Sequence, residues 1–497
     1  MKSYILAIDQ GTTSTRSILV DRYGVVVASA QLAVQSQFPQ PGFVLQDPYE
    51  LLNSAVQTMQ MVLQKAGIRA SEIASAGLTN QRETAIVWDI RTGKPLYPAI
   101  VWQSRQSAEI IEAWNHTIGK DKIRQRTGLV SDAYFSASKI AWILDEVEGA
   151  QVLAEQGYLR FGTVDSWLMW QFSEFKIHAI DATNASRTML FNIDTLNWDL
   201  GLCAEMGIPE HVLPEIKPSM YDHGYIPAKY LGADVPLTAI AGDQHAALFG
   251  QACFSPGMVK NTYGTGCFML MHTGQKAVKS DSGLLTTLAW TSENTVEYAL
   301  EGSVFVAGSA VQWLRDAMGI IKTSEESEAL ALSVNDTGGV YVVPAFTGLG
   351  APYWDQEARG AVFGLTRGST AAHLTRAVLE SLAYQTRDMM ELMTSVSGIP
   401  LQTLRVDGGA ASNNWLMQFQ ANQLQCEVSR PKYTESTVLG VAFMAGLQAG
   451  FWSSKEEIAA LRKSDAVFKP DGDAAVANST YQRWKKAVEV CRLFNPK

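Results

Sequence analysis

Two short, donor-rich segments occupy similar places in the two halves of the sequence. Residues 9–14 (DQGTTS) and residues 263–266 (YGTG) each follow an apolar run that favours a β-strand, and Arg16 comes just after the first segment. Glycine lets backbone N–H groups approach a ligand closely, Thr and Ser hydroxyls add donors, and a guanidinium adds a fixed positive charge. Either segment alone is also compatible with an ordinary polar turn. Together they indicate two hairpins that could hold a polyphosphate from both sides, with Asp9 placed to bind Mg²⁺ through water.

Charged residues follow two further apolar runs. Arg82 and Glu83 come after the first of them, and they could donate and accept hydrogen bonds with adjacent hydroxyls of a polyol. Asp243 follows the second run, where a carboxylate could act as general base on a substrate hydroxyl. A surface ion pair would explain Arg82 and Glu83 equally well, and a helix N-cap would explain Asp243 equally well. His245 is expected to pack in the interior.

Paired glycines at residues 408–409 join an apolar strand to a helix that is expected to begin near Asn413. Such a turn lets the backbone approach a flat ring or a sugar, although a merely structural turn would have the same sequence. The sequence contains no Walker A motif, GxGxxG, HExxH or GxSxG. If the chain binds a nucleotide, the two hairpins and the paired glycines are therefore the candidates.

The composition is that of a large packed protein. The chain has 497 residues, 47% of them hydrophobic and 18% charged. Division by roughly 150 residues per domain gives about three domains, but two lobes of roughly 250 residues fit as well. The 40 basic and 49 acidic residues give a net charge of −9, and no basic cluster is present. This charge pattern argues against a nucleic-acid partner.

The cysteines and the apolar stretches indicate the compartment. The five cysteines never lie closer than 14 residues apart (253 to 267), so they form no CxxC motif and no disulfide framework. An odd number of cysteines without a secretory signal favours a reducing cytosol. Charge-free stretches at residues 23–46 and 337–354 contain many Gln, Gly or Pro residues and do not resemble bilayer helices. We expect a cytoplasmic protein without a membrane span.

The elements that must position these residues are a mixture of strands and helices. Residues 4–8, 17–20 and 25–27 predict a three-stranded meander around the first hairpin, and a similar strand-hairpin-strand unit begins at residue 258. One face of a long helix is apolar through Leu374, Val378, Leu382, Met389 and Met393. We predict an α/β protein of two lobes, residues 1–250 and residues 251–497, with a cleft between them.

Longer segments resemble the FGGY family of carbohydrate kinases, and the resemblance covers almost the whole chain. Residues 134–146 and 360–380 are similar to the two family signatures, and residues 9–14, 80–84, 101–103 and 263–268 follow the pattern of the members that phosphorylate glycerol. The resemblance implies a two-lobed actin/hexokinase-like ATPase fold with a ribonuclease H-like core in each lobe. It also implies a transferase that uses ATP and Mg²⁺.

The resemblance further implies roles for individual residues. Hydrogen bonds with the hydroxyls of glycerol are implied for Arg82, Glu83, Tyr134, Asp243 and Gln244, and packing against its carbon chain is implied for Trp102 and Phe268. Nucleotide contacts are implied for Thr12, Thr13, Ser14, Arg16, Thr265, Gly308, Gln312, Gly409 and Asn413. Mg²⁺ would lie near Asp9 and Asp243.

The expected reaction is transfer of the γ-phosphate of ATP to glycerol in glycerol catabolism, which gives sn-glycerol 3-phosphate and ADP. Asp243 would take the proton of a terminal hydroxyl, whose oxygen attacks the γ-phosphorus in line with the departing ADP. A kinase of the same family for another polyol or a ketose is the nearest alternative. A non-enzymatic ATP-dependent binding protein is a more distant one, because it would leave Arg82, Glu83 and Asp243 unexplained. Members of the family form dimers and tetramers, so a homodimer or homotetramer is expected.

Overall fold

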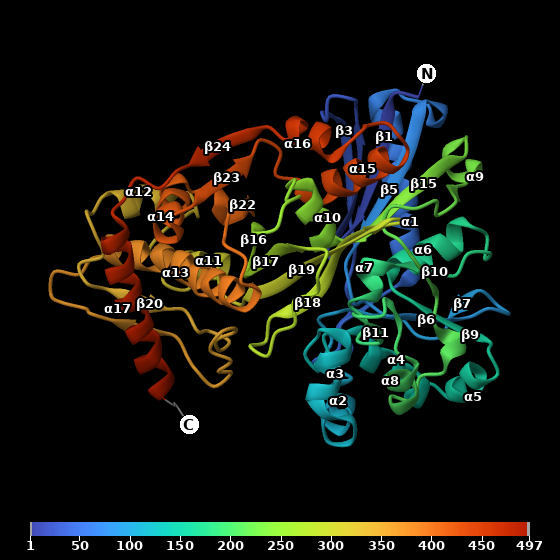
Figure 1. Ribbon diagram of the computed structural model, residues 1–497, viewed down its shortest axis with the longest axis horizontal. Helices are drawn as coiled ribbons and strands as arrows, with labels where there is room; N and C mark the ends of the chain where they lie inside the picture. The colour runs from blue at the N-terminus through green and yellow to red at the C-terminus, as the bar shows by residue number, and fades with distance from the viewer. Residues whose placement is uncertain (1, 495–497) are drawn as a thin grey trace.

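The computed structural model describes residues 2–494, which fold around two central β-sheets (Figure 1). The first sheet has the strand order β14-β15-β5-β1-β2-β3. Its strands are β1 (Tyr4–Gln10), β2 (Ser14–Val20), β3 (Val26–Ala33), β5 (Ile73–Asn80), β14 (Tyr225–Ile226) and β15 (Val235–Gly242). The pairs β1–β2 and β2–β3 are antiparallel, which confirms the predicted meander, whereas β1–β5 and β5–β15 are parallel.

The second sheet repeats this arrangement. Its order is β18-β19-β17-β16-β22-β23-β24. The strands are β16 (Met258–Tyr263), β17 (Cys267–Gly274), β18 (Leu285–Ser292), β19 (Thr295–Val304), β22 (Thr403–Gly408), β23 (Glu427–Pro431) and β24 (Ser464–Phe468). Strands β16, β17 and β19 pair antiparallel in that order, and β18 lies outside β19 at the edge of the sheet. On the other side, β22 adds in parallel to β16, and β23 adds in parallel to β22. Both halves of the chain therefore begin with a hairpin that lies at the centre of its sheet.

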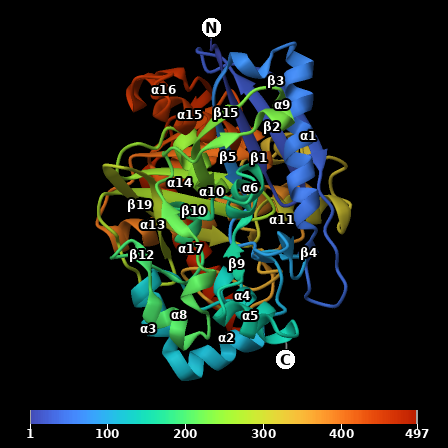
Figure 2. The ribbon, with the colours of Figure 1, turned by 90° about the vertical axis from the view of Figure 1, so that its right-hand side faces the viewer.

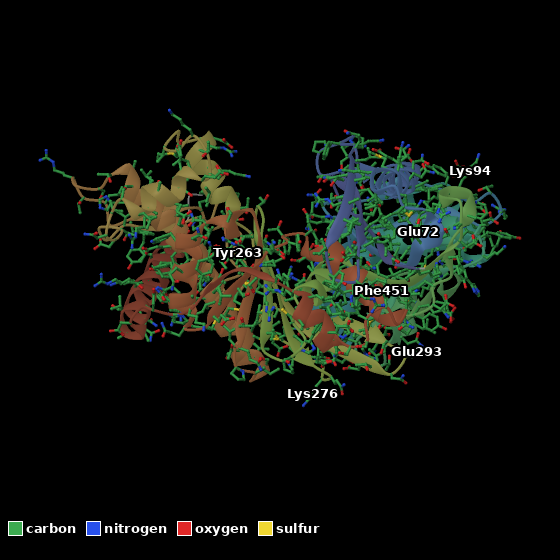
Figure 3. The ribbon with its side chains drawn as sticks, turned by 90° about the horizontal axis from the view of Figure 1, so that it is seen from above. Glu72, Lys94, Tyr263, Lys276, Glu293 and Phe451 are labelled. Atoms are coloured by element: carbon green, nitrogen blue, oxygen red, sulfur yellow. The ribbon has the colours of Figure 1, made fainter. Side chains whose placement is uncertain are left out.

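Helices from distant parts of the sequence cover the first sheet. Its inner strands pack on one face against α1 (Pro48–Ala66) and α6 (Val164–Phe172). On the other face lie α10 (Asp243–Gly250), α15 (Ser436–Gln448) and α16 (Lys455–Leu461), although the last two come from the end of the chain. Figure 3 shows Phe451, between α15 and α16, on the same side of the molecule as Glu72, whereas Tyr263 lies on the other.

The contact between α10 and α15 depends on a glycine. A Cβ at Gly440 of α15 would lie 1.7 Å from the backbone oxygen of Ala246 in α10. Any larger residue would therefore push the two helices apart. This close approach fixes α10 against the sheet, and α10 begins with Asp243.

The second sheet shares a hydrophobic core with α11 (Gly308–Asp316), α12 (Glu326–Leu332), α13 (Ala371–Ser397) and α14 (Asn414–Leu424). Helix α17 (Ala474–Leu493) packs outside this core, on α13, α14 and the short strand β20 (Tyr341–Val343). The predicted apolar face of α13 is confirmed, because Val378, Leu382, Met389 and Met393 are all buried and Leu374 packs beside them. Helix α14 begins one residue after Asn413, as predicted.

A third, smaller layer has a core of its own below the first sheet. It contains β6 (Ile86–Asp89), β7 (Lys94–Pro95), β9 (Leu159–Gly162), α2 (Ala108–Trp114), α3 (Lys120–Thr127), α4 (Ser136–Glu146), α5 (Ala150–Glu155) and α8 (Leu200–Glu205). Figure 2 shows α2, α3, α4, α5 and α8 gathered at the end of the molecule opposite α16. This layer carries Trp102 and Tyr134. Within residues 2–494, no helix is long and apolar enough to cross a membrane.

Candidate active site

Three predicted residues lie at one edge of the first sheet. Asp9 is near the end of β1, Arg82 follows β5, and Asp243 is the first residue after β15. Because these neighbouring strands are parallel, their carboxyl ends meet at the same edge. Gly242, not Asp243, is the N-cap of α10. A Cβ at Gly242 would lie 2.7 Å from Cγ of Arg82, so this glycine makes room for the arginine.

Arg82 and Glu83 belong to a buried charge cluster. Nε of Arg82 lies 3.0 Å from Oδ1 of Asp243, and its Nη1 lies 2.6 Å from Oε2 of Glu301. Arg187 bridges the remaining members, with Nε 2.7 Å from Oε1 of Glu83 and Nη2 2.9 Å from Oε1 of Glu301. The four side chains other than Asp243 are at most 3% exposed, so the alternative of a surface ion pair is wrong.

Arg187 and Glu301 were not among the residues predicted from the sequence. Arg187 follows the short helix α7 (Ala182–Ala185), and Glu301 lies on β19 of the second sheet. Burial opposes the ionisation of Glu301, but the charges of Arg187 and Arg82 outweigh it and lower the pKa of Glu301 to about 2. The only sequence signal was a glutamate within the otherwise uncharged residues 298–304. Glu301 ties the second sheet to the edge of the first.

Trp102 and Tyr134 form an aromatic wall next to this cluster. Their ring centroids lie 5.6 Å apart at an angle of 77°. The indole N–H of Trp102 donates to the hydroxyl of Thr12 over 2.9 Å. The buried Lys139 holds the loop that carries Tyr134, because its ammonium donates to the backbone carbonyl groups of residues 133–135. These hydrogen bonds hold the Trp102 ring and the loop that carries the Tyr134 ring in place.

Gln244 and Phe268 meet through a third residue that the sequence analysis missed. The buried Lys260 of β16 donates from its ammonium to Oε1 of Gln244 and, over 3.3 Å, to the backbone oxygen of Phe268. Gln244 follows Asp243 on α10, and Phe268 lies on β17. Burial lowers the pKa of Lys260, and the charges of Asp407 and Asp243 oppose that shift.

The first hairpin is a tight turn between β1 and β2. The backbone N–H of Gly11 donates to the backbone oxygen of Ser14 over 3.0 Å, which closes the turn. Thr12 and Ser14 are half-buried, whereas Thr13 is exposed at the tip. The turn thus presents the predicted hydroxyls on three consecutive residues.

Arg16 follows this hairpin and has two partners. Its Nε and Nη2 donate to Oε1 of Gln31 over 3.1 and 2.6 Å. Its Nη1 pairs with the carboxylate of Glu435, the residue that precedes α15. A phosphate that binds Arg16 must therefore compete with Glu435.

The second hairpin packs on the start of α11. The backbone N–H of Gly308 donates to the oxygen of Gly264 over 3.0 Å, which brings Gly308 next to Thr265. Thr265 and Gln312 are both exposed, on the hairpin and on α11. Three of the residues predicted to contact nucleotide therefore lie together where the second hairpin meets α11.

The paired glycines end β22 beside this hairpin. A Cβ at Gly408, whose φ is +89°, would lie 2.3 Å from the backbone oxygen of Tyr263, so the glycine allows the close approach. Gly409 is exposed, with open space where a Cβ would lie. Asn413 is buried, and its side chain caps α14 by accepting the N–H of Leu416 over 2.8 Å. Asn413 thus has a structural role of its own.

Asp9 and Asp243 are close enough to interact electrostatically. Burial and the negative charge of Asp243 raise the pKa of Asp9 to about 7, and the charge of Arg16 opposes this shift. No cluster of three or more His, Cys, Asp or Glu side chains suited to a metal occurs within residues 2–494. A pair of carboxylates that repel each other still fits Mg²⁺, which takes one or two carboxylates together with water and substrate phosphates.

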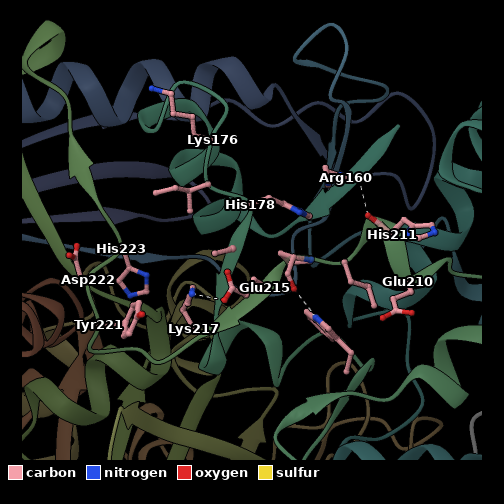
Figure 4. A pocket seen from close by; sticks show the side chains of 15 residues that line it. Arg160, Lys176, His178, Glu210, His211, Glu215, Lys217, Tyr221, Asp222 and His223 are labelled. Carbon is pink, nitrogen blue, oxygen red and sulfur yellow. Dashed lines mark hydrogen bonds and ion pairs between the residues drawn. The ribbon is translucent and has the colours of Figure 1, made fainter. Parts of the chain in front are cut away.

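A large open pocket lies away from these residues (Figure 4). Its volume is about 910 Å³, and it opens beside β9, β10 (Ala179–Asp181) and β13 (Glu215–Lys217). It contains none of the predicted site residues. Its charged lining residues balance in sign, with three basic and three acidic side chains: Arg160, Lys176, Lys217, Glu210, Glu215 and Asp222. The candidate site therefore stays assigned to the charge cluster and the two hairpins, although this pocket is large.

Comparison with known proteins identifies close relatives. Residues 4–250 match the N-terminal domain of the FGGY family of carbohydrate kinases, and residues 259–449 match its C-terminal domain. A glycerol kinase of Thermoanaerobacter pseudethanolicus is 55% identical over 489 residues, which cover 98% of each chain. A glycerol kinase of Bacillus licheniformis is 54% identical over 99% of this chain and 100% of its own.

Solved structures agree with this relationship. The crystal structure of Plasmodium falciparum glycerol kinase with ADP superposes with a TM-score of 0.94 at 36% identity, covering 98% of both chains. A xylulose kinase from Lactobacillus acidophilus has a TM-score of 0.87 at 21% identity and shares the fold. The expected two-lobed actin/hexokinase-like α/β fold is thereby confirmed. From its sequence matches over both domains, the chain belongs to the FGGY family of carbohydrate kinases.

Proposed function

We propose that this carbohydrate kinase transfers the γ-phosphate of ATP to glycerol, giving sn-glycerol 3-phosphate and ADP, in glycerol catabolism. The observation that carries the proposal is the buried charge cluster beside an aromatic wall. Arg82 and Glu83 supply donors and an acceptor for neighbouring hydroxyls, and Trp102 supplies an apolar surface for a short carbon chain. Relatives at 53–55% identity that are named glycerol kinases support this substrate.

Recognition of glycerol combines five polar side chains with two rings. The polar set is Arg82, Glu83, Tyr134, Asp243 and Gln244, and the apolar set is Trp102 and Phe268. Because the ion pairs within the cluster are buried, the groups are already oriented before substrate enters. An analogue without one hydroxyl would leave a buried partner without a hydrogen bond, which is costly.

Asp243 is the proposed general base. Oδ1 of Asp243 contacts both Nε of Arg82 and the backbone N–H of Gln244. Oδ2 then accepts the proton from a terminal hydroxyl of glycerol. The hydroxyl oxygen attacks the γ-phosphorus, the bond to the β-phosphate oxygen breaks, and ADP leaves with that electron pair. Asp243 is 31% exposed, so the proton can pass to solvent afterwards.

The phosphates of ATP are assigned to the two hairpins. The first hairpin and the strand after it contribute the phosphate contacts Thr12, Thr13, Ser14 and Arg16. The second hairpin and α11 contribute Thr265, Gly308 and Gln312. Gly409 and Asn413 belong to the adenosine side. Asp9 and Asp243 would hold Mg²⁺, which neutralises phosphate charge when it is bound. We place the lobe boundary near residue 250, with the polyol groups other than Phe268 on residues 1–250 and the adenosine side on residues 251–497.

A glycerol-dependent ADP-release assay tests the proposal. ATP and glycerol should give ADP together with a product that a stereospecific sn-glycerol 3-phosphate dehydrogenase oxidises. Asp243→Asn should lower kcat by about 10²- to 10⁴-fold without loss of thermal stability. ATP hydrolysis that is indifferent to glycerol would contradict the function, and near-normal turnover in the Asp243→Asn variant would contradict the base. Light scattering tests the homodimer or homotetramer that we expect for this family member.

A further inference from the structure

Lys260 is a buried cation, and both of its hydrogen-bond partners belong to the proposed substrate site. Its side chain is completely buried on β16, and none of the ion pairs within residues 2–494 includes it. Taking an ammonium out of water without a carboxylate partner is costly. The acceptors that compensate are Oε1 of Gln244 and the backbone oxygen of Phe268. Both residues were assigned above to glycerol, the first to a hydroxyl and the second to the carbon chain.

The chemistry of the ammonium determines how Gln244 is turned. A protonated lysine offers three donors and no acceptor, whereas a glutamine side chain has one oxygen acceptor and one amide nitrogen with two donors. The atom of Gln244 that faces Lys260 is therefore its oxygen. Its amide NH₂ group must face away from Lys260, and Gln244 is half-exposed beside Asp243.

We infer that Lys260 is a positioning residue that fixes Gln244 as a hydrogen-bond donor toward the polyol. The substrate must then present an oxygen lone pair at this point. The contact also joins the two central sheets, because Lys260 lies on the second sheet and Gln244 follows a strand of the first. This inference rests on the proposed function and goes beyond it by naming the residue that orients one substrate contact.

A double-mutant cycle with Lys260→Met and Gln244→Leu tests the inference. Kinetics are measured with glycerol and with its two deoxy analogues, propane-1,2-diol and propane-1,3-diol. Lys260→Met should raise the KM for glycerol about tenfold with a smaller change in kcat, as expected for one misdirected hydrogen bond. In the double variant, KM should be within about twofold of Gln244→Leu alone. Both single variants should lose discrimination against the same deoxy analogue.

Gln244→Glu provides a variant whose folding is not at risk. A glutamate can pair with Lys260, so the melting temperature should be maintained or rise, but the group turned toward substrate becomes an acceptor. KM for glycerol should again rise about tenfold. An unchanged KM in this variant would overturn the donor assignment.

Lys139→Met is the matched control, because Lys139 is also a fully buried lysine that donates to backbone oxygens. Its effect should add to that of Gln244→Leu, since it acts on the loop of Tyr134. Additive effects of Lys260→Met and Gln244→Leu would overturn the inference. The wild-type rate with glycerol tests the proposed function separately. If another polyol proves to be the substrate, the same cycle is measured with that polyol.

Discussion

The indole N–H of Trp102 donates to the hydroxyl oxygen of Thr12 over 2.9 Å, and this hydrogen bond joins the two halves of the proposed reaction. Trp102 belongs to the aromatic wall of the polyol site, and Thr12 belongs to the first phosphate hairpin. A shift of the hairpin should therefore displace the Trp102 ring that faces the substrate, and a shift of the ring should displace the hairpin.

Removal of this hydrogen bond should affect both substrates. Trp102→Phe keeps an aromatic ring but loses the donor, and Thr12→Val keeps the shape but loses the acceptor. We expect each variant to raise the KM values for ATP and glycerol several-fold, with a coupling energy of about 1 kcal/mol in the double variant. Thr12→Ser, which retains a hydroxyl, is the control. Additive effects on kcat/KM would show that the bond does not couple the two sites.

Glu301 should be essential for both stability and glycerol affinity. Glu301→Gln removes the charge that compensates Arg82 and Arg187 in the interior, so we expect the free energy of unfolding to fall by about 3–5 kcal/mol. KM for glycerol should rise because Arg82 loses its anchor. Glu297→Gln is the matched control on the same strand, since Glu297 is also buried but pairs with His272. Denaturant titration and kinetics should show an unchanged KM for that control, and an equal rise in KM would contradict our account.

Asp9→Asn should weaken the dependence on Mg²⁺. If Asp9 holds the ion directly or through water, the Mg²⁺ concentration for half-maximal activity should rise by about 10- to 100-fold. Without Mg²⁺ the same variant should melt at a higher temperature than wild type, because burial and the charge of Asp243 disfavour an ionised Asp9. Asp21→Asn, in the following turn, is the control. A Mg²⁺ titration curve that coincides with the wild-type curve would remove Asp9 from the site.

Asp388 should make the stability pH-dependent. It accepts hydrogen bonds from Tyr481 and Trp484 of α17, and burial raises its pKa from 3.8 to about 6 despite them. The folded state then binds this proton more tightly than the unfolded state. The free energy of unfolding should therefore fall as the pH rises from about 4 to about 6, by roughly 3 kcal/mol from this group.

Asp388→Asn removes that titration. Measured between pH 5 and pH 7, its melting temperature relative to wild type should become more favourable as the pH rises. Asp336→Asn, at an exposed turn, should leave the pH dependence unchanged. A constant difference between Asp388→Asn and wild type across this range would show that Asp388 has an ordinary pKa in the fold.

The local patterns predicted most of the architecture. The meander of β1, β2 and β3 and the apolar face of α13 follow from periodicity and from turn residues, which act over a few positions. The packing of α15 and α16 on the first sheet could not be predicted in this way. It depends on a close approach between Gly440 and Ala246, which are 194 residues apart (440 − 246).

Contacts between residues far apart in the sequence also limit what can be predicted of the site. Arg82 and Asp243 stand at strand ends, where a charged residue is visible in the sequence. Glu301 and Lys260 lie inside strands and reach the site only because two sheets meet, so nothing near them in the sequence indicates their partners. A charged residue inside an apolar strand was the available signal, because a buried charge must have a compensating group.

The acceptor specificity tests the central claim most directly. We would compare kcat/KM for glycerol, erythritol, xylulose and gluconate at saturating ATP and Mg²⁺, with ADP release as the readout. The charge cluster, the aromatic wall of Trp102 and Tyr134, and Phe268 predict that glycerol has the highest kcat/KM and that the product is sn-glycerol 3-phosphate. A higher kcat/KM for any of the longer substrates would contradict the assignment of this site to glycerol.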